Sequence, residues 1–307
     1  MHKSLHIGAF AIIILGCVAL IPSTARATVY LSLDAEEGTV GQTIPNPPFC
    51  QTECSGSGAK GTFESADGAA QGAQYYQWRT VQSQGEAYTV VGNAGQNPPL
   101  VADLLGKTLY LGWYFNFTRI DGNDIWHEGQ LQSGDKGVEI RGPGVRWGVA
   151  NGQWETVAAN QDHRYTVWLG NPTYHLNPEL EHVDIYFPNQ SGYSATHTIQ
   201  LDYENWHSAV LGVHFAFDQT GWVGVWIDGE KVYDYANIRT ASSAEGTPRI
   251  AHLTLNGTIA QGALDAPPHL RKYDAFLLTD NWQDVIDGGY LAADRLAPAA
   301  PTNLSVQ

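Results

Sequence analysis

Residues 206–235 constrain the fold more tightly than any other part of the chain. Their sequence is WHSAVLGVHFAFDQTGWVGVWIDGEKVYDY, which predicts two long strands joined by a polar turn and then a tight hairpin. Apolar residues occupy both sets of alternate positions in 206–218 and in 222–228, as expected for strands that are covered on both faces. Asp228 and Gly229 form the hairpin dipeptide that favours a type I′ turn, whose central residues need positive φ angles. The segment therefore predicts stacked antiparallel sheets.

Short strand-like segments with glycine and asparagine turns recur along the rest of the chain, and helical periodicity is nearly absent. We expect strands at 29–33, 75–81, 108–119, 125–128, 138–141, 146–149, 165–169, 182–187, 196–202, 208–217, 222–227, 231–235, 249–255 and 273–279. A short helix is expected at 99–105 or 282–286, and a glycine-rich loop at 56–72. Many short strands with few helices indicate an all-β sandwich.

The N-terminus has the pattern of a secretory signal. A basic start precedes an apolar run at 7–21 that is too short to span a membrane. Small residues at Ala25 and Ala27 suit cleavage before Thr28, whereas the alternative is a lipid anchor on Cys17. We predict a signal peptide at 1–27, one domain at 28–295, a Pro/Ala-rich tail at 296–307, and a secreted or periplasmic location.

The chain carries a formal charge of -15, which argues against nucleic acid and anionic membranes as partners. Cys50 and Cys54 lie four positions apart, and in an oxidising compartment they predict a small disulfide loop. No second Cys or His pair lies near them in the sequence, so a metal site is not expected there. We expect a monomer.

Basic residues gather locally in spite of the acidic balance: Arg119, Lys136, Arg141, Arg146 and Arg164 fall within a short span. Glu139 and Arg141 share one face of a predicted strand, because side chains two residues apart point the same way. Glu139 would hold Arg141 in place, and arginine forks grip carboxylates in bidentate fashion. A solvated surface ion pair is the alternative interpretation.

A second polar row follows at 182–186. His182, Asp184 and Tyr186 alternate with apolar residues that form the natural core face. The polar row is therefore expected to face a groove or, alternatively, the outer surface of a sheet.

The two rows suit β-elimination from a uronate-containing polysaccharide. This reaction needs a cation at the C5 carboxylate, a base for the C5 proton and an acid for the departing O4 oxygen. We assign binding of the C5 carboxylate to Arg141, helped by Arg146. We assign proton transfer to Lys136, His182 and Tyr186. No metal is required for this chemistry.

The W-H and V-W-I-D-G motifs of 206–229 resemble those of the concanavalin A-like jelly roll of lectins, laminin G domains, family 16 glycoside hydrolases and several polysaccharide lyases. Residues 186–190, followed by a Trp-led strand and this hairpin, are similar to the order found in family 14 polysaccharide lyases. Residues 137–142 resemble the Arg/Glu/Arg strand of alginate and heparin lyases. Relative to those patterns, Asp184 stands in place of the first tyrosine and Gly137 in place of the first arginine.

The resemblance covers about 108–279 and implies a jelly roll of two antiparallel sheets whose substrate is an acidic polysaccharide. It implies that Lys136 matches the catalytic lysine, and that His127 substitutes for the histidine of a missing Gln-Ile-His triplet. The expected substrate-binding residues are Arg119, His127, Glu139, Arg146, Asp184 and Gln190.

The same resemblance implies a structural Ca²⁺ between the first and last strands, with Asp34, Glu36 and Asp274 as oxygen ligands. Two alternative functions stay open. A lectin-like module would bind glycans on exposed aromatic rings without catalysis. A family 16-like hydrolase needs a third acid after Glu181 and Asp184, which the sequence lacks.

Overall fold

The structure is a computed structural model of the 307-residue chain. It describes residues 27–44, 61–65, 68–79, 89–92, 99–119, 135–141, 145–148, 164–169, 183–189, 192–195, 205–241, 247–250, 252–255 and 269–291. Within these ranges the chain is almost entirely antiparallel β-sheet, with one short 3₁₀ helix, η1 (Ala35–Glu37), and one α-helix, α1 (Trp282–Asp287). This confirms the predicted all-β jelly-roll class.

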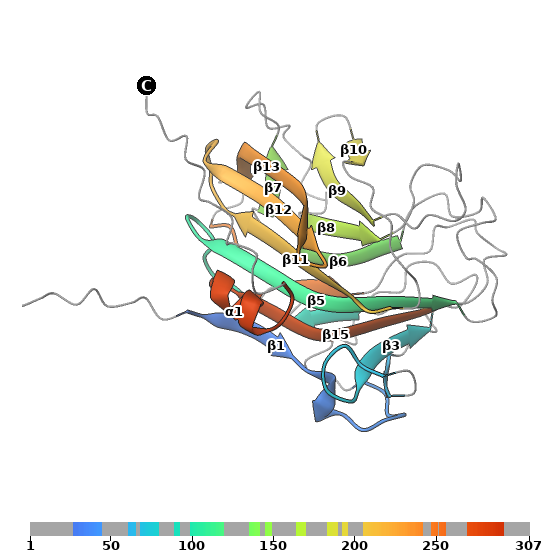
Figure 1. The fold of residues 1–307 in the computed structure, drawn as a ribbon. Helices are drawn as coiled ribbons and strands as arrows, with labels where there is room; N and C mark the ends of the chain where they lie inside the picture. The colour runs from blue at the N-terminus through green and yellow to red at the C-terminus, as the bar shows by residue number, and fades with distance from the viewer. Residues whose placement is uncertain are drawn as a thin grey trace, which may run out of the picture.

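The described strands form two sheets (Figure 1). The nine-stranded sheet contains β1 (Val29–Leu33), β2 (Thr62–Glu64), β3 (Tyr75–Arg79), β5 (Thr108–Arg119), β7 (Val145–Gly148), β11 (His207–His214), β12 (Gly221–Ile227), β13 (Glu230–Ala241) and β15 (His269–Thr279). The six-stranded sheet contains β4 (Thr89–Gly92), β6 (Asp135–Arg141), β8 (Arg164–Leu169), β9 (Val183–Asn189), β10 (Gly192–Ala195) and β14 (His252–Leu255).

The main hydrophobic core joins the two sheets. Its side chains from the nine-stranded sheet occupy alternate positions of β5, β11 and β12. They include Trp113 and Leu211, both at most 1% exposed. From the six-stranded sheet it takes Val138, Ile140 and Leu253. Since burial of apolar surface is the dominant favourable term in folding, this core fixes which face of each sheet remains outside.

A second apolar cluster covers the other face of the nine-stranded sheet. Trp282 of α1 packs against Trp226 and Tyr110, with ring centroids 4.9 and 5.0 Å away. Figure 1 shows α1 lying against β5 and β15. The cluster explains why β11 and β12 are apolar at both sets of alternate positions, and it confirms the prediction that both of their faces are covered.

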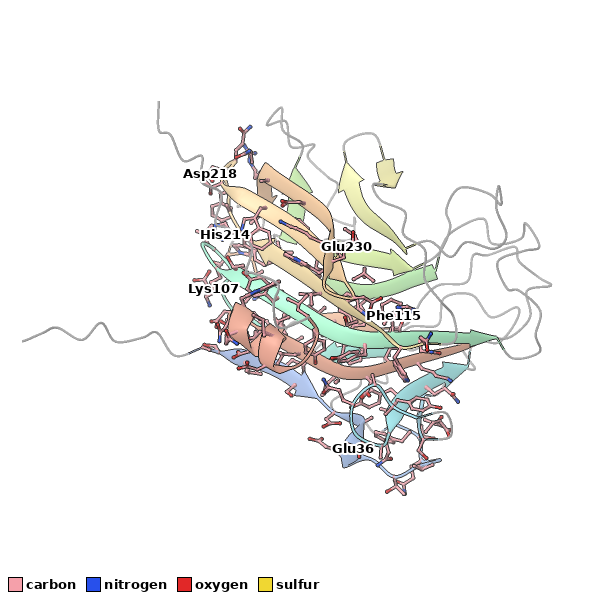
Figure 2. All side chains as sticks on the ribbon, viewed as in Figure 1. Glu36, Lys107, Phe115, His214, Asp218 and Glu230 are labelled. Carbon is pink, nitrogen blue, oxygen red and sulfur yellow. The ribbon has the colours of Figure 1, made fainter. Side chains whose placement is uncertain are left out.

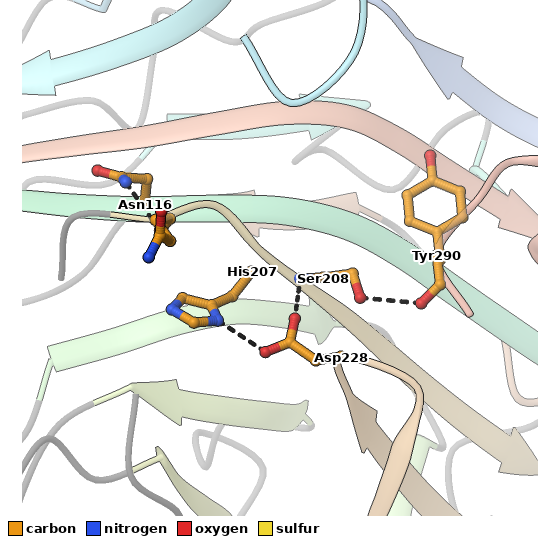
Figure 3. Close-up of polar contacts among 6 residues, drawn as sticks. Asn116, His207, Ser208, Asp228 and Tyr290 are labelled. Carbon is orange, nitrogen blue, oxygen red and sulfur yellow. Dashed lines mark hydrogen bonds and ion pairs between the residues drawn. The ribbon is translucent and has the colours of Figure 1, made fainter. Parts of the chain in front are cut away.

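The β12–β13 hairpin has the predicted turn. Asp228 and Gly229 have φ angles of 49° and 74°, the left-handed values that a type I′ turn needs. The Asp228 carboxylate also ties the turn to the start of β11: its oxygens lie 2.7 Å from Nδ1 of His207 and 2.9 Å from N of Ser208 (Figure 3). Ser208 Oγ in turn donates to the carbonyl of Tyr290, beyond α1.

Several elements differ from the sequence-based expectations. Of the two helix candidates, 282–286 is helical, whereas 99–105 forms turns and a bridge from Val101 to Ile250. Strands β2, β4 and β10 were not predicted, and β2 falls within the predicted loop at 56–72. Each has only three or four residues, and a segment this short gives a weak alternation signal. Among the described residues, no helix has the length and apolar character of a membrane span.

Candidate functional site

The six-stranded sheet has one core face and one face turned away from the core. Val138 and Ile140 of β6 are at most 2% exposed and belong to the core. Because successive residues of a strand alternate between faces, the positions of Glu139 and Arg141 fall on the face away from the core. This is the placement that the sequence predicts for them.

A β-bulge brings Lys136 onto the same face. Lys136 pairs with Trp168 of β8 and Val138 pairs with Val167, so the register shifts across Gly137. In a regular strand Lys136 and Glu139 would fall on opposite faces, since they are three residues apart. The bulge inserts one extra residue between them, so Lys136 returns to the face of Glu139. The positions of Lys136, Glu139 and Arg141 therefore share one face.

The register extends this face across β8 to β9. Thr166 pairs with Glu139 on one side and with Tyr186 on the other. Trp168 likewise pairs with both Lys136 and Asp184. The second predicted polar row therefore lies on the same face as the first, two strands away. Neighbouring strands are about 4.8 Å apart, so about 10 Å separates the backbones of β6 and β9.

A row of basic positions crosses the sheet beside these residues. Arg141 pairs with Arg164 of β8 and with His252 of β14. Like charges directly opposite each other on neighbouring strands are unfavourable, so this row favours an anionic ligand. Glu139 is the acidic position diagonal to Arg164 and two residues from Arg141.

Other predicted site residues lie elsewhere. Arg119 is at the end of β5, where it pairs with His269, and Arg146 is on β7, which pairs with β13. Both strands belong to the nine-stranded sheet, although β7 also contacts β8 and β9. Several predicted residues lie outside the described part of the chain: His127, His182, Gln190, Cys50 and Cys54.

Residues of β8 and β14 contribute to these rows although local sequence patterns do not assign them a site role. Local patterns place Arg164 in a basic cluster and give no role to Thr166 or His252. Their places in the rows depend on which strands are neighbours, and strand order follows from contacts between distant parts of the chain. The alternation of polar residues in 164–168 is the one local signal that was available.

The predicted calcium ligands belong to other elements: Asp34 and Glu36 follow β1 at the start of η1, and Asp274 is on β15 of the nine-stranded sheet. Asp274 of β15 is 0% exposed, and its Oδ1 has no hydrogen-bond partner. Its Oδ2 accepts from N of Gln71 at 2.9 Å. The pKa of the Asp274 carboxyl is raised to about 7, mainly by burial and also by the negative charge of Asp34, against backbone N–H groups that favour the charged form.

This environment fits a hard cation only in part. A buried carboxylate oxygen without a partner is unfavourable unless a cation or a proton neutralises it, and calcium accepts carboxylate and backbone carbonyl oxygens. Within the described residues, however, no three acidic, histidine or cysteine side chains form a metal-binding group. A calcium ion would therefore rely on Asp274, Asp34 and backbone carbonyls, and the chemistry it would supply is structural.

Comparison with known proteins identifies the fold. An endo-β-1,4-glucuronan lyase from the fungus Trichoderma reesei has a TM-score of 0.51 at 15% sequence identity, covering 84% of this chain and 98% of that one. A PL-14 alginate lyase from Aplysia kurodai has a TM-score of 0.51 at 11% identity, covering 83% and 100%. At these identities the likeness shows a shared jelly-roll fold. A search of curated protein sequences gave no match.

Comparison with a protein-family model identifies the family of the chain. The model described as polysaccharide lyase matches residues 54–251, a range that includes β6, β8 and β9 and ends just before β14. The match covers more than half of the sequence and contains the positions of Lys136, Glu139, Arg141, Arg164 and Tyr186 on the six-stranded sheet. The chain belongs to the polysaccharide lyase family.

Proposed function

We propose that the protein cleaves a uronate-containing polysaccharide by β-elimination on the outer face of the six-stranded sheet. The observation that carries this proposal is the register, which gives Lys136, Glu139, Arg141 and Tyr186 positions on one face of three consecutive strands. The two solved lyases named above act on glucuronan and alginate, both of which are polyuronates, and they support the choice of substrate class.

Charge neutralisation at the C5 carboxylate is the largest requirement of the reaction, because the proton next to a carboxylate anion is barely acidic. Arg141 would meet this requirement, with Arg164 opposite it and Glu139 as its positioning acid. Fixed cations at the developing negative charge stabilise the transition state more than the ground state.

Proton transfer would use groups on the two strands that flank β8. A base removes the C5 proton, the released electron pair forms the C4–C5 double bond, and the C4–O4 bond breaks as an acid protonates O4. Lys136 on β6 and Tyr186 on β9 flank β8 from opposite sides, which suits a sugar ring held between a base and an acid. His182 is the third candidate for proton transfer.

The product gives a direct test of the reaction. Elimination creates an unsaturated uronate that absorbs ultraviolet light, whereas hydrolysis and simple binding do not. We expect absorbance to rise when the protein is incubated with glucuronan or alginate, with heparin as a third acidic substrate. Binding to these polymers without any unsaturated product would instead favour the lectin-like alternative.

We further propose that the protein is exported, with cleavage before Thr28 and a disulfide between Cys50 and Cys54. A secreted lyase would meet extracellular polysaccharide directly. The mass of the exported protein, measured before and after reduction and alkylation, tests both features. An intact N-terminus or two free thiols would contradict them.

A further inference from the structure

A pair of glycines on the outer face of the nine-stranded sheet supports two tryptophan rings. Gly212 of β11 and Gly224 of β12 lie directly opposite each other. A Cβ added at Gly212 would lie 3.0 Å from the Trp222 ring, and one added at Gly224 would lie 2.7 Å from the Trp226 ring. Glycine in a strand often marks such a close approach. The two indole rings therefore rest on the backbone of β11 and β12.

These tryptophans are the two ends of a row of aromatic rings. Trp226 contacts Trp282 of α1, Trp282 contacts Tyr110, and Tyr110 contacts Trp222, with ring centroids 4.9, 5.0 and 6.2 Å apart. The first three rings are at most 8% exposed, whereas Trp222 is only partly buried. The row therefore ends in a ring that its neighbours hold in place and that solvent reaches. A side chain already held in place loses little freedom when a ligand binds.

Polar groups lie beside the Trp222 ring. His214 is opposite Trp222 on β11, and its Nδ1 lies 3.0 Å from Oγ1 of Thr108. Burial lowers the pKa of His214, so its ring is uncharged at neutral pH. Ala236 is opposite Trp222 on β13 and is partly exposed. Trp222 thus has hydrogen-bonding groups on one side and a small side chain on the other.

The charges around this surface are not basic. Asp218 accepts from N and Oγ1 of Thr220, and these bonds lower its pKa and keep it ionised. Figure 2 shows Asp218 and His214 at the same end of the sheet. The Lys231 ammonium pairs with Asp234 at 2.7 Å, which cancels its charge. Lys107 lies over an aromatic ring of β1 instead. Among these described groups, the charge left beside Trp222 is negative.

This combination fits an uncharged glycan better than a polyuronate or a protein. Sugar C–H faces stack on aromatic rings, while sugar hydroxyls form hydrogen bonds with nearby polar side chains. A polyuronate would be repelled by Asp218, whereas the six-stranded sheet offers it the basic positions of Arg141 and Arg164. A stable protein interface needs about 800 Å² from each partner, and one tryptophan supplies at most about 250 Å².

We propose that Trp222 is the centre of a second glycan-binding site, which takes an uncharged, flat chain of the β-1,4-glucan class. The β-1,4 linkage keeps the sugar rings in an extended ribbon, so their C–H faces can lie against a planar side chain. His214 and Thr108 would receive the hydroxyls at the edge of the ribbon. Such a site would hold the protein on a neutral polysaccharide while the other sheet acts on a polyuronate.

Calorimetric titration of the full chain with cellohexaose tests this site without any measurement of activity. We expect the wild type to bind cellohexaose at one site. Trp222→Ala should weaken binding at least about tenfold, because it removes the stacking ring. Ala236→Glu should weaken binding to a similar extent, because its longer side chain covers the ring. This second variant keeps every contact described above, so it provides the test if Trp222→Ala does not fold.

Two controls separate this site from other surfaces. Trp206→Ala is the matched control, because Trp206 is also a partly exposed tryptophan but precedes the other end of β11. It should bind cellohexaose as the wild type does. Arg141→Ala should also keep cellohexaose binding, and Trp222→Ala should keep the rate at which unsaturated product forms from soluble glucuronan. Failure of the lyase proposal would therefore leave the binding test unaffected.

Three results would overturn the inference. One is a wild type that does not bind cellohexaose. Another is unchanged affinity in Trp222→Ala or in Ala236→Glu, or a loss in Trp206→Ala as large as in Trp222→Ala. The third is displacement of cellohexaose by alginate at equal concentrations of sugar units, which would contradict the selection for an uncharged chain.

Discussion

The raised pKa of the buried Asp274 carboxyl leads to a quantitative prediction about stability. Its pKa is raised from an ordinary value of 3.8 to about 7, with burial as the first cause. Between these values the folded state keeps a proton that the unfolded state has released. The free energy of unfolding therefore falls as pH rises through this window, by about 1.4 kcal/mol per pH unit. Three pH units give a loss on the order of 4 kcal/mol, a large part of a typical domain's stability.

Asp274→Asn tests this magnitude, since an amide of nearly the same shape carries no charge at any pH. Urea unfolding, followed by tryptophan fluorescence, is measured in EDTA at about pH 4.5 and about pH 7.5. The quantity compared is the free energy of unfolding of the variant minus that of the wild type. This difference should be larger at the higher pH than at the lower pH by roughly 3–4 kcal/mol. Identical pH dependence of the two proteins in EDTA would refute the reasoning.

Three further substitutions test contacts in the fold. Asp228→Ala removes both hydrogen bonds from the turn to β11 and places alanine at positive φ, so urea unfolding should show a loss of about 2 kcal/mol; a loss below about 0.5 kcal/mol would contradict the tie. Gly72→Ala introduces a Cβ against Glu36. It should lower the free energy of unfolding by about 1–2 kcal/mol and the melting temperature by several degrees. An unchanged melting temperature would show that the backbone around Gly72 shifts to accept the Cβ at no cost. Tyr290→Phe removes the hydrogen bond to Ala275 and should lower the free energy of unfolding by about 1 kcal/mol. Equal stability would show that other contacts hold the backbone at Ala275.

Much of the fold could be predicted from local patterns. The strands at 29–33 and 108–119 begin and end where alternation and turn residues place them. The Asp228–Gly229 hairpin forms as expected because the turn needs positive φ values that this dipeptide adopts readily. In contrast, β2, β4 and β10 are set by pairing with neighbouring strands, and their few residues carry no period of their own.

The candidate site was predictable only in part. Glu139 and Arg141 follow simple alternation, but Lys136 reaches their face through a bulge across Gly137. A bulge changes which positions share a face, and the sequence does not mark it beyond the presence of a glycine. Arg164 and His252 join the row because β8 and β14 flank β6, an order set by the packing of the whole sheet.

The surroundings of Asp274 were also predictable only in part from the sequence. The acids near each end of the chain were identifiable as candidate ligands from sequence. Their different contacts depend on residues 68–74, whose backbone N–H groups donate to Glu36 and to one oxygen of Asp274. Backbone donors have no signature in a sequence, so only the folded structure shows which carboxylate oxygens they reach.

The proposed reaction is elimination across a uronate that Arg141 holds on the outer face of the six-stranded sheet. The most direct measurement is the rate at which unsaturated product forms from glucuronan and alginate with wild type, Arg141→Ala and Arg249→Ala, a partly exposed arginine outside the rows. We predict activity in wild type and Arg249→Ala, and none in Arg141→Ala at an unchanged melting temperature. Full activity in Arg141→Ala would contradict the account.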